Sequence, residues 1–359
     1  MFFNPVNSQS RRKNRPEMAV MPTTKDLAEA AGVSLATVDR VLNGRPGVRK
    51  ETIEAVNMAI QRIGFERNHV AAILARQRGY RFGFVVPQPH GEFVGEILDR
   101  IHEANKAFRA ERIEAEALKV NETDPHQTAR FLAALDPNKF DGVAIMAPET
   151  PQIRDAIKRL EERGIKSIAF VSNQGGGREG DFVGIDNYAA GATAGRIMGR
   201  FCGSANGSIM VIGDSMKSRD SVERRLGFDH VINSAFPHLK VLPSLEFHGD
   251  PERARQIVAN TVRSRPDLVG AYVASSEARV PIEALFASDG ARKIVKIAHE
   301  KTDFTRTALL SDQLDAVVHQ DPGHLVRSAI RTLWAKCDKR AVFESQERIR
   351  IEILIKDNL

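Results

Sequence analysis

Beyond residue 81 the sequence alternates between short apolar runs and longer amphipathic stretches, and this alternation restricts the fold more than any other feature. Runs such as FGFVVPQ and GVAIMAP have the length of buried strands, whereas stretches near 94–110, 125–135 and 151–163 have the length and period of helices. The expected strands are 82–88, 113–120, 142–148, 166–172, 207–213, 240–247, 270–275 and 294–300. Strands that alternate with helices form parallel sheets covered on both faces. Two such series predict an α/β body of two doubly wound subdomains.

A different pattern precedes the body, where residues 23–43 read TTKDLAEAAGVSLATVDRVLN. Thr23 and Asp26 have the spacing of a capping box and predict a helix from about Thr24 to Ala31. Gly32 permits a sharp left-handed turn, and Ser34 caps a second short helix. The helical period places apolar residues on the inward face of each helix: Leu27, Ala28 and Ala31 on the first, and Val38, Val41 and Leu42 on the second. This pattern is typical of a DNA-binding helix-turn-helix, and the alternative is an ordinary surface helix in a small bundle.

A third helix is expected over Lys50–Ile63, with Gly64 ending it. Together the three helices make a minimal bundle over residues 22–66. Residues 67–80 follow as a short, small-residue stretch, which predicts a hinge helix or linker. A stretch of fewer than about 12 residues rarely forms a stable helix alone in water, so this one is expected to fold only against a partner.

From Thr23 to Ala75 the sequence resembles, without a gap, the DNA-binding headpiece of the lactose-repressor family of bacterial transcription regulators. The resemblance implies that Leu35, Ala36 and Arg40 contact base edges in the major groove and that Ser34, Thr37 and Asn43 bind phosphates. It also implies that Asn68, Ala71, Leu74 and Ala75 form the hinge, with Leu74 wedged between base pairs in the minor groove. The chemistry agrees, because arginine spans guanine O6 and N7, alanine touches a thymine methyl, and hydroxyl or amide groups suit phosphate oxygens. For Leu74, burial in a plain hydrophobic core is the alternative.

Two residues depart from the family pattern. Asp39 stands where the family usually has serine, and a carboxylate near phosphates is repulsive unless it reads a cytosine amino group or pairs with a neighbouring arginine. Arg67 stands where the family usually has proline before the hinge asparagine. We therefore expect an unusual operator preference and a less rigid linker, or one that adds a phosphate contact.

Positive charge is concentrated in the amino-terminal part of the chain. Residues 1–81 hold 14 Lys and Arg against 7 Asp and Glu, whereas the remainder holds 38 against 39. A basic segment beside a near-neutral body is expected for a phosphate-binding module with salt-sensitive affinity. Residues 1–21 form an expected disordered basic tail without an assigned role, and Met18 or Met21 is an alternative start.

Composition limits the remaining classes. The hydrophobic content of 42% supports large cores, and no run approaches the roughly 18 apolar residues that a membrane span needs. Cys202 and Cys337 are the only cysteines, which favours a reducing cytoplasm and argues against a disulfide framework or a cysteine-based metal site. No secretory signal is recognisable at the start. No metal and no cofactor are expected, and neither is contact with a membrane.

The body resembles the ribose-type periplasmic sugar-binding fold that forms the regulatory body of the same family. In that fold the chain crosses three times between subdomains, and we expect the crossings near 184–187, 299–301 and 320–322. These crossings divide the body, 81–345, into an N-subdomain of 81–185 plus 299–319 and a C-subdomain of 186–298 plus 320–345. Residues 346–359 are expected to form a terminal strand and tail. Ligands of such folds sit in the cleft at the carboxyl ends of the strands.

The resemblance assigns five residues to the cleft: Phe93, Glu149, Arg224, Glu277 and Gln320. Each has a plainer alternative. Phe93 suits a core, both glutamates suit solvated loops, and Arg224 suits an ion pair on its own helix. The pairs Ser276–Glu277 and His299–Glu300 differ from the usual polar pairs, which leaves open a ligand other than an ordinary hexose.

The sequence is therefore interpreted as a cytoplasmic, ligand-responsive transcription regulator, most simply a repressor. Its expected partners are double-stranded DNA with a near-palindromic operator, a small sugar-like effector and a second copy of the chain. The alternative is a sugar-binding protein or enzyme of this fold without a role in gene regulation. An enzyme is not expected, because a phosphate-binding GxxxxGK[ST] loop, a GxSxG elbow and an HExxH zinc motif are all missing from the sequence.

Overall fold

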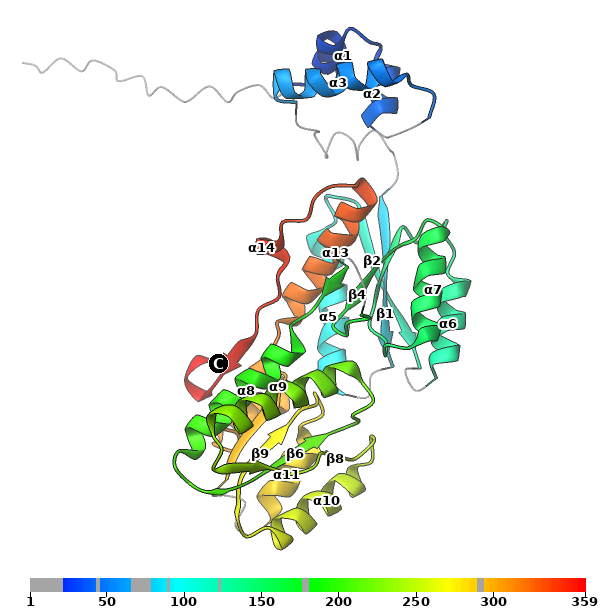
Figure 1. Ribbon diagram of the computed structural model, residues 1–359. Coiled ribbons are helices and arrows are strands. Elements are labelled where there is room, and N and C mark those ends of the chain that lie inside the picture. The colour runs from blue at the N-terminus through cyan, green and yellow to red at the C-terminus, as the bar shows by residue number, and fades with distance from the viewer. Residues whose placement is uncertain are drawn as a thin grey trace, which may run out of the picture. The chain divides into compact units, whose positions relative to one another are not determined.

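The computed structural model describes residues 22–42, 46–65, 79–88, 91–121, 124–175, 181–288 and 294–359. The chain divides into two compact units, Met1–Arg78 and Gly79–Leu359. The second unit contains two sheets, whose strands and covering helices are drawn in Figure 1.

The first unit is a three-helix bundle with the predicted helix bounds. Its helices are α1 Thr24–Ala31, α2 Leu35–Leu42 and α3 Lys50–Ile63. Both hydrogen bonds of the Thr23–Asp26 capping box are present, and Gly32 has the left-handed φ of 65° that the turn requires. The small core consists of Leu27, Ala28, Val38, Val56, Ala59 and Phe65. The guanidinium of Arg62 donates to the carbonyl of Ala30, which ties α3 to α1.

The first sheet of the second unit is wholly parallel, with the order β2-β1-β3-β4-β5. Its strands are β1 Tyr80–Pro87, β2 Ile113–Val120, β3 Gly142–Ile145, β4 Lys166–Phe170 and β5 Phe182–Val183. On one face α6 Pro125–Ala134 and α7 Pro151–Glu162 enclose an apolar cluster. The other face is covered by α5 Glu92–Ala107 and by α13 Pro322–Asp338, which comes from much later in the chain.

The second sheet has the order β12-β11-β10-β9-β6-β7, and β8 also pairs with β6. Its strands are β6 Gly207–Gly213, β7 Leu239–Val241, β8 Leu245–Glu246, β9 Leu268–Val273, β10 Val295–His299, β11 Ala316–His319 and β12 Glu352–Leu354. All pairs are parallel except β11–β12. The predicted strand 240–247 is two short strands, because Pro243 lies between them and cannot donate to a ladder.

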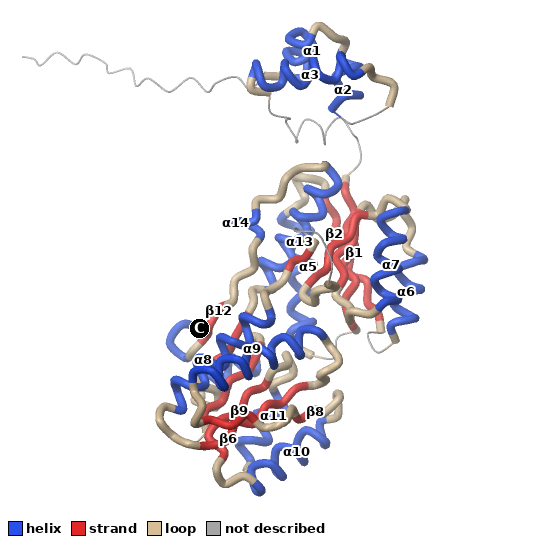
Figure 2. The backbone as a smooth tube through the Cα atoms, viewed as in Figure 1, coloured by secondary structure: helices blue, strands red, loops and turns tan. Residues whose placement is uncertain are grey.

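Helices cover both faces of this sheet as well (Figure 2). The helices α8 Asn187–Cys202 and α9 Arg219–Ala235 pack on one face. The opposite face carries α10 Pro251–Ser264, α11 Arg279–Ala287 and α12 Asp303–Leu310. After α13 the chain forms the single turn α14 Glu344–Glu347, and a short 3-10 turn, Lys356–Asn358, follows β12. The expected fold class, two doubly wound parallel-sheet subdomains, is confirmed.

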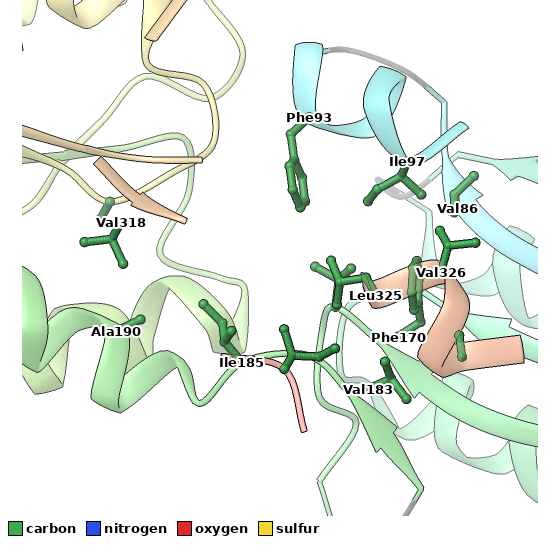
Figure 3. Close-up of a cluster of buried hydrophobic side chains, with 14 of the residues drawn as sticks. Val86, Phe93, Ile97, Phe170, Val183, Ile185, Ala190, Val318, Leu325 and Val326 are labelled. Carbon is green, nitrogen blue, oxygen red and sulfur yellow. The ribbon is translucent and has the colours of Figure 1, made fainter. Parts of the chain in front are cut away.

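One apolar cluster extends through both subdomains. Figure 3 shows Phe93, Ile97 and Phe170 from the first subdomain and Ala190 and Val318 from the second, with Ile185 at a crossing between them. The two sheets are therefore joined by packed side chains as well as by the chain crossings.

The predicted positions of the crossings need correction. The chain leaves the first sheet at residues 184–186, as expected, but the predicted crossing near 299–301 is wrong, because β10 and β11 pair within the second sheet. The second crossing lies at 320–321, and the third lies between α14 and β12. Residues 299–319 therefore belong to the C-subdomain, and α13 within 320–345 belongs to the N-subdomain, the reverse of the predicted division. The helix α12 confirms this division by packing on the second sheet.

Candidate functional site

The first candidate surface is the outward face of α2. Leu35, Ala36 and Arg40 are exposed there, and Leu35 keeps 47% of its surface in contact with solvent although it is apolar. Val38, on the side of the helix opposite Ala36 and Arg40, is 1% exposed and anchors α2 in the bundle. Ala36 and Arg40 thus share the outward face of α2, and Leu35 is exposed at its amino-terminal edge.

The start of α2 carries the two predicted phosphate-binding hydroxyls that the structure describes. The Oγ of Ser34 accepts from the amide of Thr37 at 3.1 Å and lies 2.9 Å from the Oγ1 of Thr37. Both hydroxyls are therefore held at the helix N-terminus, where backbone dipoles favour negative charge. Asn43 and the predicted hinge residues Asn68, Ala71, Leu74 and Ala75 lie outside the described residues.

The second candidate surface lies between the subdomains, where the carboxyl ends of the first sheet face the start of α9. It contains a shallow, open hollow whose empty volume, counted together with the solvent at its mouth, is about 370 Å³. We call it the interdomain hollow, and it is lined by Pro87, Met146, Ala147, Pro148, Glu149, Ser172, Asn173, Ser218, Arg219 and Asp220. Of the five predicted ligand contacts, only Glu149 lines it.

An ion pair crosses this hollow. Nη1 of Arg219 donates to Oε2 of Glu149 at 2.9 Å, and Nε of Arg219 donates to Oε1 of Glu223 at 2.6 Å. The hydrogen bonds to both carboxylates raise the pKa of Arg219. Gly175 packs closely on this pair with a left-handed φ of 64°, and a Cβ there would lie 2.5 Å from Oε1 of Glu149.

A second polar contact crosses the hollow next to the first. Oγ of Ser172 donates to Oδ2 of Asp220 at 2.6 Å, whereas the buried Oδ1 of Asp220 has no hydrogen-bond partner among the described residues. Burial raises the pKa of Asp220, although the Ser172 hydroxyl and Arg224 oppose the shift. Neither Asp220 nor Ser172 is among the five residues that the resemblance assigns to the cleft.

Arg224 and Gln320 meet at a buried carboxylate, Glu300. The side chain of Arg224 is 7% exposed and that of Glu300 is 1% exposed, and Nη2 of Arg224 lies 3.4 Å from Oε1 of Glu300. Arg224 also donates to Oδ1 of Asn187 at 2.7 Å and to the carbonyl of Ala274 at 3.1 Å. Gln320 donates to Glu300 through its side chain at 3.0 Å. The alternative pairing of Arg224 on its own helix is therefore wrong.

Tyr272 and His299 form a buried pair close enough to Arg224 to feel its charge. The hydroxyl of Tyr272 lies 2.6 Å from Nε2 of His299, and the Tyr272 ring stacks on Phe228 with centroids 4.5 Å apart. Burial, together with the charge of Arg224, lowers the pKa of His299 well below its usual value. This histidine is therefore neutral at physiological pH.

Phe93 and Glu277 do not line the interdomain hollow. Phe93 is 3% exposed and packs in the apolar cluster that joins the subdomains (Figure 3), which fits its alternative as a core residue. The carboxylate of Glu277 lies against the backbone of Gly91, so closely that a Cβ there would overlap it. Next to this contact, Glu92 pairs with Arg279 and its Oε2 accepts from the amide of Phe304 at 3.1 Å. Glu277 thus takes part in a contact between the subdomains.

Strained backbone marks the strand ends of this region. Val171, just before Ser172, has a φ of 61°, and Glu300 has a φ of 62°. Residues other than glycine rarely adopt a positive φ, and β-branched residues such as valine adopt it least. Residues with this strained backbone conformation concentrate at functional sites. Neither feature can be read from sequence, because the conformation is imposed by distant contacts.

Two further findings concern membrane spans and metal sites. Among the described helices, none is long and apolar enough to cross a membrane. Within the same described part of the chain, His, Cys, Asp and Glu side chains form no group of three that is arranged to hold a metal ion.

The chain has a helix-turn-helix unit followed by two α/β subdomains that are joined by chain crossings. This architecture defines a protein with a DNA-binding type of headpiece and a body like that of type I periplasmic binding proteins. Family comparisons agree. Residues 23–68 match "Bacterial regulatory proteins, lacI family", and residues 82–341 match "Periplasmic binding protein domain". The chain thus combines a lacI-family helix-turn-helix domain with a body that belongs to the periplasmic binding protein domain family.

Curated relatives carry regulator names. The HTH-type transcriptional repressor PurR of Serratia proteamaculans is 29% identical over 181 residues, 50% of this chain and 51% of the relative. The HTH-type transcriptional regulator AglR of Rhizobium meliloti is 30% identical over 182 residues, 48% of each chain. The chain thus spans about half the length of the curated relatives it matches.

Solved structures share the body fold. A putative LacI transcriptional regulator from Bacteroides fragilis has a TM-score of 0.67 at 19% identity. The match covers 78% of this chain and 98% of the Bacteroides chain. GanP, a glucose-galactose binding protein from Geobacillus stearothermophilus, has a TM-score of 0.68 at 17% identity and covers 79% and 99%.

Proposed function

We propose that this chain is a sequence-specific DNA-binding transcription regulator, acting as a repressor, whose operator affinity is set by a small sugar-like effector held between the two subdomains. The observation that carries the proposal is the exposed face of α2, with Ala36 and Arg40 on it and Leu35 exposed at its amino-terminal edge, in a unit that matches the lacI family. An apolar side chain as exposed as Leu35 suits a surface that meets a partner.

The roles on α2 follow from groove chemistry. Arg40 reads a guanine through two hydrogen bonds, Ala36 touches a thymine methyl, and Leu35 packs against base edges. Ser34 and Thr37, with Asn43 beyond the described part of α2, bind phosphates and set the register of the helix. The exposed Asp39 lies on the same helix and selects against bases that it repels.

Two copies of the chain pair, so that two headpieces occupy the half-sites of a near-palindromic operator in the cytoplasm. A two-fold dimer matches an operator of two-fold symmetry, and half-site spacing follows from the distance between recognition helices. The hinge residues Asn68, Ala71, Leu74 and Ala75 fold together in the minor groove in this proposal.

Effector control uses the contacts between the subdomains. Glu149 pairs with Arg219 and Ser172 with Asp220 from opposite sides of the interdomain hollow, so a ligand placed there changes the energy of closure. Arg224, Glu300 and Gln320 extend this site behind the hollow. To loosen DNA binding a hundredfold, the effector needs about 2.7 kcal/mol of differential affinity between the two states.

The test is DNA binding by Arg40→Ala. Electrophoretic mobility shift and footprinting on DNA upstream of the chain's own coding region should detect a specific site for the unchanged protein. Arg40→Ala should lose discrimination at one base pair by about 1–3 kcal/mol, while weak, salt-sensitive binding remains.

Lys25→Ala is the matched control, because it removes one exposed positive charge from α1 without changing α2. It should weaken binding to all sequences alike. Unchanged specificity in Arg40→Ala would contradict the assignment of Arg40. Equal, feeble binding of the unchanged chain to every duplex, together with sugar binding, would support a sugar-binding protein without a regulatory role.

A further inference from the structure

Most polar groups of the interdomain hollow have hydrogen-bond partners, but one buried oxygen does not. Arg219 is shared between Glu149 and Glu223, at 2.9 and 2.6 Å, so its positive charge is compensated twice. The Ser172 hydroxyl proton is used on one oxygen of Asp220. The other oxygen, Oδ1, is buried and has no partner among the described residues. A buried acceptor without a donor is costly, so the hollow is suited to a ligand that donates at this point.

Charge favours the same kind of ligand. Three carboxylates, Glu149, Asp220 and Glu223, lie at the hollow or bond to its lining, and the guanidinium groups bonded to them belong to Arg154 and Arg219. Of the three, Asp220 is the carboxylate without an ion pair of its own among the described residues. The charges of Arg219 and Arg224 act on Asp220, but the hydrogen bonds of Arg224 go to Asn187, Ala274 and Glu300 and leave Oδ1 of Asp220 without a donor.

Helix N-termini attract negative charge, so the start of α9 is a place where an anion could bind. Here that role is already filled by the protein. The Oγ of Ser218 caps the helix by accepting from the amide of Ser221 at 3.3 Å, and Asp220 places a carboxylate in the first turn. An added phosphate or carboxylate would also be repelled by Glu149, Asp220 and Glu223.

Apart from Asn173, the remaining wall is apolar and consists of Pro87, Met146, Ala147 and Pro148. Such a wall suits the carbon face of a saturated ring. We infer that the interdomain hollow takes a hydroxylated ring that bears an ammonium group, an amino sugar or aminocyclitol, with the ammonium donating to Oδ1 of Asp220. The inference rests on the proposed function for its regulatory meaning, and it narrows the effector from sugar-like compounds in general to aminated ones.

The test compares matched ligands that differ in one group. Isothermal titration of the full chain would use D-glucosamine against D-glucose and D-galactosamine against D-galactose. N-acetyl-D-glucosamine serves as the uncharged derivative and D-glucose 6-phosphate as the anionic one. A charge-assisted hydrogen bond is about twice as strong as a neutral one, so the amine of at least one pair should bind about tenfold tighter or more.

Asp220→Asn tests the residue. Its side-chain oxygen can still accept from Ser172, but an N–H then replaces Oδ1, so amine affinity should fall at least about tenfold and the preference over the neutral sugar should disappear. The control is Asp155→Asn, an exposed carboxylate of α7 that pairs only within its own helix among the described residues. It should bind like the unchanged protein. A urea melt checks that both variants fold.

Three outcomes overturn the inference: neutral or anionic sugars that bind as tightly as the amines, no amine binding at all, or an unaltered preference in folded Asp220→Asn. These measurements contain no DNA. Failure of the proposed function would appear instead as a lack of specific operator binding in the mobility-shift experiment, whatever the sugars do.

Discussion

The side chain of Arg224 connects polar groups from three different segments of the second subdomain. It is 6% exposed, and its guanidinium bonds to groups from α8, β9 and the end of β10. Two charges buried together repay their loss of hydration only while both are present. The same contacts that place Arg224 behind the interdomain hollow thus make it necessary for the stability of the second sheet.

We expect Arg224→Ala to destabilise the protein by about 3–5 kcal/mol, because Glu300 is left buried without its cation. Urea unfolding followed by circular dichroism measures this loss. The double variant Arg224→Met, Glu300→Gln should recover most of it, since both charges are then removed. A loss below about 1 kcal/mol in Arg224→Ala would show that Glu300 is not held by this pair.

Residue-level inference from sequence succeeded where the side chain's direction follows from a local period. The exposure of Ala36 and Arg40 follows from the period of α2 alone, whereas Leu35, on the side of the buried Val38, is exposed at the first residue of the helix. It failed in the interdomain hollow, because Ser172 and Asp220 are 48 positions apart and meet only when the two subdomains are placed together. Glu300 was recognised as unusual, but its partner Arg224 lies 76 positions away.

At the scale of elements, α8 and α9 pack so closely that their backbones touch. A Cβ added to Gly191 would overlap the backbone carbonyl of Arg224, and one added to Gly227 would overlap the carbonyl of Tyr188. These glycines let the two helices approach until their backbones touch. The approach also sets the position of Arg224 against Asn187 at the start of α8.

Gly191→Ala should therefore destabilise the protein by about 1–3 kcal/mol or more, because the obstructing atom is backbone and cannot rotate away. Gly95→Ala on α5 is the control, since a Cβ there meets nothing within 4 Å. Alanine favours helix, so the control should be stabilised by up to about 1 kcal/mol. Thermal unfolding of both variants measures the difference, and equal melting temperatures would refute the close approach.

The three headpiece helices, the first three helices of the body and most strands were predicted from sequence, because their periods and lengths are clear. Among the strands of the two sheets, β5, with two residues, and β11, with the four residues AVVH, were not predicted, because they are too short for a pattern. Missing β11 also misplaced the second crossing, since the strand joins β10 in the second sheet before the chain crosses at Gln320. Which sheet a short strand joins is decided by tertiary packing, not by its own residues.

At the scale of the whole second unit, the two subdomains are held by polar contacts outside the shared apolar cluster. Glu92 on α5 pairs with Arg279 on α11 and accepts from the amide of Phe304 on α12. Burial alone would raise the pKa of Glu92, but hydrogen bonds from Arg279, Thr302 and Phe304 lower it below its usual value. Its stabilising contribution is therefore present above the unfolded pKa, near 4.5, and is lost as pH falls through the folded pKa.

Glu92→Ala should loosen this edge of the interface without unfolding either subdomain. Hydrogen–deuterium exchange should then be faster at the amide of Phe304, since that N–H loses its acceptor. Glu103→Ala is the control, because Glu103 pairs with Arg100 within the same helix, α5. Unchanged protection at Phe304 in Glu92→Ala would mean that this amide is shielded by other groups.

The three crossings have a consequence for how the protein is made. The helix α13, which covers one face of the first sheet, leaves the ribosome after every strand of that sheet, and β12 at the edge of the second sheet follows it. The first subdomain therefore waits, with part of its apolar face uncovered, until α13 has been translated. A chain halted before Pro322 lacks both α13 and β12, so neither subdomain is complete, and such a product is expected to be a substrate for proteases rather than a shortened regulator.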